Sequence, residues 1–120
     1  MYSATFKDHL TNPRNVGDLT DASVVAEETN PVCGDRLRLS LRVADDRIEA
    51  ARFLAYGCPP TLVCGSALAE KLPGLSMAEA EDLTGQDIVN AVGGLPARKK
   101  HAAALAIETL KSALKMIKAN

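Results

Sequence analysis

The sequence predicts an α+β fold in which a three-stranded antiparallel sheet comes first and helices then pack on one of its faces. Two observations carry this prediction. Residues 36–43 alternate between apolar and polar side chains, as a half-buried strand does, and residues 98–118 repeat apolar side chains every three or four positions, as an amphipathic helix does. Because one face of the sheet is apolar, it needs a helical cover. We expect a single domain over residues 1–120.

The first half of the chain carries the expected strands, which are short and separated by turn residues. In the last of them, simple alternation places Phe53 on the face opposite to Ile48, Ala50, Arg52 and Leu54. The expected strands cover residues 23–28, 36–43 and 48–56, with Asp45-Asp46 as the turn of the hairpin.

The expected helices lie mainly in the second half. A first helix over residues 2–10 ends before Asn12-Pro13, because the residue before a proline avoids helical geometry. Two short helices begin at capping boxes, and a proline after a glycine pair opens the last helix. The positions are residues 61–71, the boxes Ser76/Glu79 and Thr84/Asp87, the turn Gly93-Gly94-Leu95-Pro96 and the helix at about 98–118.

Composition excludes several classes of function. A net charge of −1 gives no basic surface for nucleic acid, and four aromatic residues without tryptophan provide no platform for stacked bases. No window is apolar enough to span a membrane, and the N-terminus lacks the apolar region of a signal peptide. With 3 cysteines, an odd number, we expect a reduced, cytoplasmic protein with no nucleic-acid or membrane partner.

Three segments carry residues of the types that bind metals. Cys33 and Asp35 are two residues apart, and Gly34 between them permits a turn that aims both side chains at one point. Cys58 lies where the third strand meets a helix, whose positive end favours the thiolate that a metal binds. His101 lies in the first turn of the last helix. Two thiols, a carboxylate and an imidazole are a tetrahedral set for zinc, or four ligands for a two-iron cluster.

Each of these residues also has an ordinary structural interpretation. Free cysteines such as Cys33 and Cys58 are often buried in a core. A lone histidine is usually a surface residue, which is what we expect of His9 and what His101 would be without the other ligands. Cys64 follows Cys58 by six residues, so the two point in different directions on a regular helix. We expect Cys64 to pack in the core and keep it as a reserve ligand.

Together, these segments resemble the IscU/NifU family of iron–sulfur cluster assembly scaffolds, and the resemblance runs nearly from end to end. It implies the family fold, a three-stranded antiparallel sheet with helices on one face, and a binding site made of Cys33, Asp35, Cys58 and His101. The matching strings are, in order, Asn12-Pro-Arg-Asn-Val-Gly17, Asn30-Pro-Val-Cys-Gly-Asp35, Tyr56-Gly-Cys58 and the Gly94-Leu-Pro96 turn that precedes the histidine.

The resemblance also implies a function. In this family a cysteine desulfurase passes persulfide sulfur to scaffold thiols, iron arrives, and a [2Fe–2S] cluster is built and handed to apo-proteins. The implied partners are therefore a cysteine desulfurase and apo iron–sulfur recipient proteins, and the implied role is not enzymatic. The weak oxygen ligation of Asp35 suits a cluster that must leave again. Zinc is a second metal that the isolated protein could hold at the same residues.

The sequence departs from the family at two places. The family has His-Cys at the start of the last helix, whereas this chain has His101-Ala102, so the third thiol is absent. The signal that an Hsp70-type chaperone reads is also altered, to Leu95-Pro-Ala-Arg-Lys99, which argues against that partner. Three interpretations remain: a working scaffold or carrier, with Cys64 as a reserve ligand; a module that holds zinc or iron; and a sulfur relay in which Cys33 or Cys58 takes persulfide.

Overall fold

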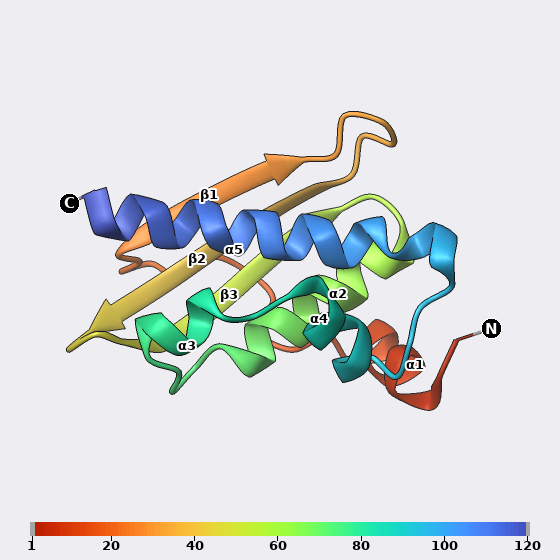
Figure 1. Ribbon diagram of the computed structural model, residues 1–120, viewed down its shortest axis with the longest axis horizontal. Coiled ribbons are helices and arrows are strands. Elements are labelled where there is room, and N and C mark those ends of the chain that lie inside the picture. The colour runs from red at the N-terminus through yellow and green to blue at the C-terminus, as the bar shows by residue number, and fades with distance from the viewer. Residues whose placement is uncertain (1, 120) are drawn as a thin grey trace.

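A computed structural model describes residues 2–119 and shows one sheet covered on one face by helices (Figure 1). The strands are β1 (Val24–Thr29), β2 (Arg36–Ala44) and β3 (Arg47–Tyr56). The helices are α1 (Ala4–Thr11), α2 (Pro59–Lys71), α3 (Met77–Glu81), α4 (Gly85–Ala91) and α5 (His101–Ala119), and the 3₁₀ turn η1 (Ala97–Lys99) precedes α5. The predicted fold class is confirmed.

The sheet has the order β1-β2-β3, and both pairs are antiparallel. Asp45 and Asp46 form the predicted two-residue turn, both with positive φ (52° and 63°). Such a turn twists in the sense that the strands of a hairpin require. All three strands lie within about one residue of the predicted ranges, because their alternation and turn residues are unambiguous.

The predicted facing of β3 is wrong. Ile48 and Phe53 were placed on opposite faces, yet both lie in the core with 1% of their surface exposed. The cause is a β-bulge: Val43 pairs with Ile48 but Arg42 pairs with Ala50, so Glu49 is an extra residue. A bulge shifts the alternation by one, which brings both large side chains to the same face.

Helices α2 and α5 form the layer that covers the sheet, and α5 crosses it diagonally in Figure 1. α5 packs on β1 and β2, while α2 packs on β3. Four of the buried α5 residues are alanines (Ala102, Ala103, Ala106 and Ala113), which lets the helix approach the sheet closely. Under it lie the fully buried leucines of β2 (Leu37, Leu39 and Leu41).

The helix ends follow the sequence closely. Both predicted capping boxes form, at Ser76 and at Thr84. α2 begins two residues earlier than predicted, because Pro59 and Pro60 occupy positions where no helical N–H is needed. α5 begins at His101 rather than near 98, since the preceding residues form η1.

The expectation that His9 is a surface residue is wrong. Only 3% of it is exposed, and its Nδ1 lies 2.7 Å from the hydroxyl oxygen of Ser66 on α2. His9 follows Phe6 by three residues, so both point from α1 towards α2, where Phe6 packs on Val63 and Ala67. Among residues 2–119, no helix has the length and apolar character needed to cross a bilayer.

Candidate metal centre

Three chain segments meet at one end of the sheet, beside the start of α5 (Figure 1). They are the loop of residues 30–35 between β1 and β2, the junction between β3 and α2, and the first turn of α5. Each predicted ligand lies on one of these segments. Cys33 and Asp35 come from the loop, Cys58 from the junction and His101 from the helix.

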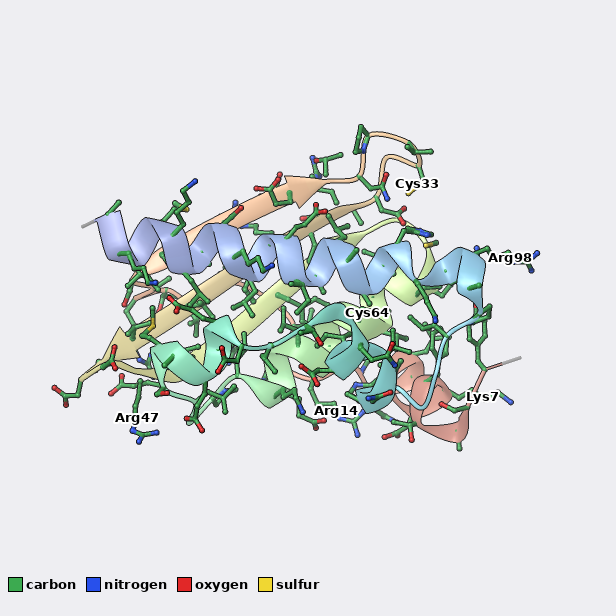
Figure 2. The ribbon with its side chains drawn as sticks, viewed as in Figure 1. Lys7, Arg14, Cys33, Arg47, Cys64 and Arg98 are labelled. Atoms are coloured by element: carbon green, nitrogen blue, oxygen red, sulfur yellow. The ribbon has the colours of Figure 1, made fainter. Side chains whose placement is uncertain are left out.

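The loop is closed by its own backbone. The N–H of Asn30 donates to the carbonyl of Asp35 (2.7 Å), and the N–H of Gly34 donates to the carbonyl of Asn30 (2.8 Å). Gly34 has φ +76°, the left-handed conformation that the sequence led us to expect there. The turn leaves Cys33 exposed at the loop edge (Figure 2). Asp35 is instead buried, with 4% of its surface exposed.

Asp35 is the hub of the site. Its Oδ2 accepts hydrogen bonds from the Thr61 hydroxyl (2.8 Å) and the Cys58 thiol (3.0 Å), and its Oδ1 accepts one from the Cys58 N–H (3.3 Å). Burial by itself would raise the pKa of this carboxyl, but the hydrogen bonds from Cys58, Thr61 and Cys33 outweigh it and lower the pKa. The carboxylate is therefore ionised at neutral pH and aimed by the start of α2.

Gly57 makes this approach possible. Its φ is +139°, and a Cβ atom built on it would lie 2.0 Å from Oδ1 of Asp35. Any larger residue would push the carboxylate away from α2. The sequence suggested that Gly57 permits a tight approach, and the structure identifies the group that approaches.

The imidazole of His101 is set for ligation. Its Nδ1 lies 3.1 Å from the carbonyl oxygen of Arg98, which can only accept, so Nδ1 carries the hydrogen. In the neutral ring the lone pair is then on Nε2. Nε2 is buried, lies 3.8 Å from Oδ2 of Asp35 and has no hydrogen-bond partner among residues 2–119. A buried nitrogen without a hydrogen-bond partner beside a carboxylate is a favourable place for a cation.

The side chains of Cys33, Asp35 and His101 each offer one donor atom, and these atoms lie within 4.8 Å of one another. Ligands of a tetrahedral zinc ion lie about 3.5 Å apart at the usual bond lengths, so small side-chain rotations would bring the three to one ion. The Cys58 thiol is not a member of this group of three, but it contacts the group through its hydrogen bond to Asp35. All four predicted residues thus gather around one carboxylate.

Cys64 and Ala102 contribute no ligand. Cys64 is fully buried, and its burial, together with the nearby Cys58, raises the pKa of its thiol to about 12. The expected core position of Cys64 is confirmed. Ala102 is 1% exposed and belongs to the core cluster, so its methyl group packs in the core.

Two contributors to the site were missed from the sequence. Thr61 is the third residue after Cys58, and a hydroxyl in the first turn of a helix that follows a cysteine was the available signal. The carbonyl of Arg98, which orients His101, left no signal, because every residue carries a carbonyl.

Comparison with known proteins shows a family relationship. The model of the NifU-like N-terminal domain family matches residues 1–120. The chain belongs to this family. It is 40% identical over 114 residues to "Iron-sulfur cluster assembly scaffold protein IscU 1" of Archaeoglobus fulgidus, covering 95% of this chain and 74% of the relative. It is 38% identical over 117 residues to the Escherichia coli K12 protein of the name IscU, covering 94% and 91%.

Solved structures of NifU-like proteins share the fold. A NifU-like N-terminal protein from Brucella abortus superposes with a TM-score of 0.77 over 98% of this chain and 94% of its own, at 13% identity. A candidate cluster assembly scaffold for the SUF system from Fervidobacterium islandicum gives a TM-score of 0.72 at 25% identity, covering 94% and 96%. The family resemblance predicted from the sequence is thereby confirmed.

Proposed function

We propose that this chain is an iron–sulfur cluster assembly scaffold or carrier that holds a transient [2Fe–2S] cluster, or iron, at Cys33, Asp35, Cys58 and His101. The observation that carries the proposal is the gathering of these four side chains around the carboxylate of Asp35, with the buried Nε2 of His101 lacking a hydrogen-bond partner among residues 2–119. The names of the family relatives, which describe cluster assembly scaffolds, support it.

The chemistry of the four ligands fits a cargo that arrives and leaves. Two thiolates bind iron strongly, whereas a carboxylate and an imidazole bind it less tightly. Cys33 is exposed, so sulfur and recipients reach the site from the loop side. The sulfur donor is a cysteine desulfurase and the recipients are apo iron–sulfur proteins. The chain binds the cluster and passes it on, and a partner performs the chemistry that releases sulfur.

Anaerobic reconstitution with iron and sulfide tests the proposal. The expected result is visible charge-transfer absorption that vanishes in Cys58→Ala and persists in Cys64→Ala. The second variant is a matched control, because it removes the same group from the same helix region without touching the site. Absence of these bands in the unaltered protein, with iron and sulfide recovered unbound, would contradict the proposal.

A second candidate function is a module that holds a single zinc or iron ion. It is favoured by Ala102, because with the third thiol replaced the site has two thiols, one carboxylate and one imidazole, a complete set for one tetrahedral ion. Stoichiometric zinc that iron and sulfide do not displace would support this candidate over the scaffold. Persulfide on a thiol without cluster uptake would instead support a sulfur relay.

A further inference from the structure

The basic residues are distributed unevenly along the chain. Residues 98–118 contain six of the 14 lysines and arginines but one of the 15 acidic residues, Glu108. The rest of the chain therefore has an excess of negative charge, although the whole protein has a net charge of only −1. Within α5 the basic residues are Lys111, Lys115 and Lys118, and all three are exposed. The second half of α5 thus presents a basic surface.

The three lysines form one stripe on the helix. They are four and three residues apart, the spacing at which side chains are neighbours on a helix surface, and like charges at this spacing repel one another. Lys118 forms an ion pair with Glu81 of α3, whereas neither Lys111 nor Lys115 forms one among residues 2–119. By contrast, every arginine of β2 is paired with a carboxylate. The repulsion between Lys111 and Lys115 therefore has no compensation within the described part of the chain.

The lysine stripe borders a pocket between α3 and α5. The pocket has a volume of about 280 Å³ and is lined by Lys111, Lys115, Lys118, Leu114 and Glu81. In Figure 1, α3 lies beside the C-terminal half of α5, at the end of the molecule away from the metal centre. Leu114 follows His101 by 13 residues, which is a rise of about 20 Å along the helix. This α3–α5 pocket is therefore separate from the metal centre.

The pocket combines an apolar floor with charges at its rim. Leu114 is the apolar member of the lining, and Lys111 and Lys115 supply two ammonium groups that no carboxylate neutralises. An occupant that fits brings carboxylates to the lysines and an apolar side chain to Leu114. A nucleic acid fits less well, because its binding depends on many neutralised phosphates and Glu81 would repel them. The lining therefore favours an acidic protein segment that carries an apolar residue.

We propose that the α3–α5 pocket is a docking site for an acidic segment of a partner protein, which places carboxylates at Lys111 and Lys115 and an apolar side chain on Leu114. The charges at the rim steer the segment to the pocket, and the apolar contact holds it there. The inference goes beyond the proposed function and does not rest on it, because no proposed ligand of the metal centre takes part.

The test uses a fluorescein-labelled synthetic peptide with a central leucine and glutamates on both sides. Its binding to the whole chain is measured by fluorescence anisotropy. At low salt we expect saturable binding that weakens as salt is added, because salt screens exposed charges. Replacing the leucine of the peptide by asparagine should raise the Kd about tenfold, since the apolar contact is lost. A peptide with lysines in place of the glutamates should not bind.

Variants of the chain make the test specific to the pocket. Lys111→Glu and Lys115→Glu should each raise the Kd about tenfold, because an attraction at the rim becomes a repulsion. Lys7→Glu is the matched control: Lys7 is also an exposed helical lysine without an ion pair among residues 2–119, but it lies on α1 at the other end of the molecule (Figure 2). This variant should leave the Kd unaltered.

Glu81→Gln should have the opposite effect and lower the Kd, because it removes a repelling carboxylate and releases Lys118 from its ion pair. A gain of affinity does not arise from misfolding, and circular dichroism verifies that the other variants are folded. The same variants should take up cluster like the unaltered protein in reconstitution with iron and sulfide. Failure of the docking site is thus distinguishable from failure of the metal centre.

Three outcomes would overturn the inference. The first is the absence of saturable binding, and the second is a loss of affinity in Lys7→Glu as large as that in Lys115→Glu. The third is displacement of the peptide by a single-stranded oligonucleotide of the same net charge that binds more tightly than the peptide does, because the lysines would then serve a nucleic acid.

Discussion

The hydroxyl of Thr61 donates a 2.8 Å hydrogen bond to Oδ2 of Asp35, the same oxygen that the Cys58 thiol contacts at 3.0 Å. The bond ties Asp35, a proposed ligand on the β1–β2 loop, to the first turn of α2. It holds the carboxylate in place and helps to lower its pKa. Thr61 itself is not a ligand, so its influence on the metal acts through Asp35.

Thr61→Val should therefore weaken metal binding while leaving every proposed ligand present. Loss of a hydrogen bond that orients a ligand costs about 10-fold to 100-fold in affinity, which competition with a zinc chelator dye would measure. The matched control is Thr109→Val. That threonine is also fully buried, but its hydroxyl donates to the carbonyl of Leu105 within α5, away from the site. Equal zinc affinity in both variants and the unaltered protein would show that Thr61 does not position Asp35.

Gly57→Ala should disturb both stability and metal binding, because the new Cβ would lie 2.0 Å from Oδ1 of Asp35. Gly74→Ala is its control, since Gly74 lies outside the site and also has positive φ (+94°) but nothing within 4 Å of its Cβ position. Backbone strain costs each variant about 1–2 kcal/mol in urea unfolding. Only Gly57→Ala should in addition lose zinc affinity. If the two variants bind zinc alike, the close approach has no role in the site.

Much of the fold was predictable because local signals agreed with one another. Residues 36–43 of β2 alternate between polar and apolar side chains, and the serine and threonine caps are followed by acidic residues at the required spacing. The facing of β3 was not predictable by the same reasoning. Ala50 and Ala51 are adjacent small apolar residues, so the strand fits either phase of the alternation. The bulge at Glu49 then decides the facing, and it arises from pairing with β2 rather than from β3 alone.

The four side chains of the site were predicted because short strings around them are specific, whereas their supports were not. Whether Thr61 reaches Asp35 depends on where α2 begins. The helix begins at Pro59, two residues before the predicted start, because the two prolines are part of its first turn. The burial of His9 depends on how α1 docks on α2, and no local pattern in residues 2–10 reports a contact with Ser66, which lies 57 residues later in the chain. The positions of Thr61 and His9 are therefore decided by contacts between distant segments, which the pattern within one segment does not show.

The three thiols should differ widely in reactivity. Cys33 is exposed and should react first with iodoacetamide, Cys58 should follow, and Cys64 should not react in the folded protein. With a pKa raised to about 12, the thiolate fraction of Cys64 is lower by about a thousandfold than that of an ordinary cysteine, in addition to its lack of access. Mass spectrometry of digested fragments over a time course measures this order, and labelling in urea should make the three alike. Comparable labelling of Cys64 and Cys33 without urea would refute the burial of Cys64.

Acidification should destabilise the protein through His9. Its burial lowers the pKa of the imidazole, with a further contribution from Arg14 that Glu70 and Asp8 oppose, so the folded state favours the neutral ring. In the unfolded chain the pKa is about 6.5. The stabilisation is therefore complete above that value and is lost as the pH falls below it towards the folded pKa. Urea unfolding at several pH values should show that the urea concentration at the midpoint decreases once the pH is below about 6.5. The decrease should be smaller in His9→Gln. An equal fall in the variant would assign the acid sensitivity to other groups.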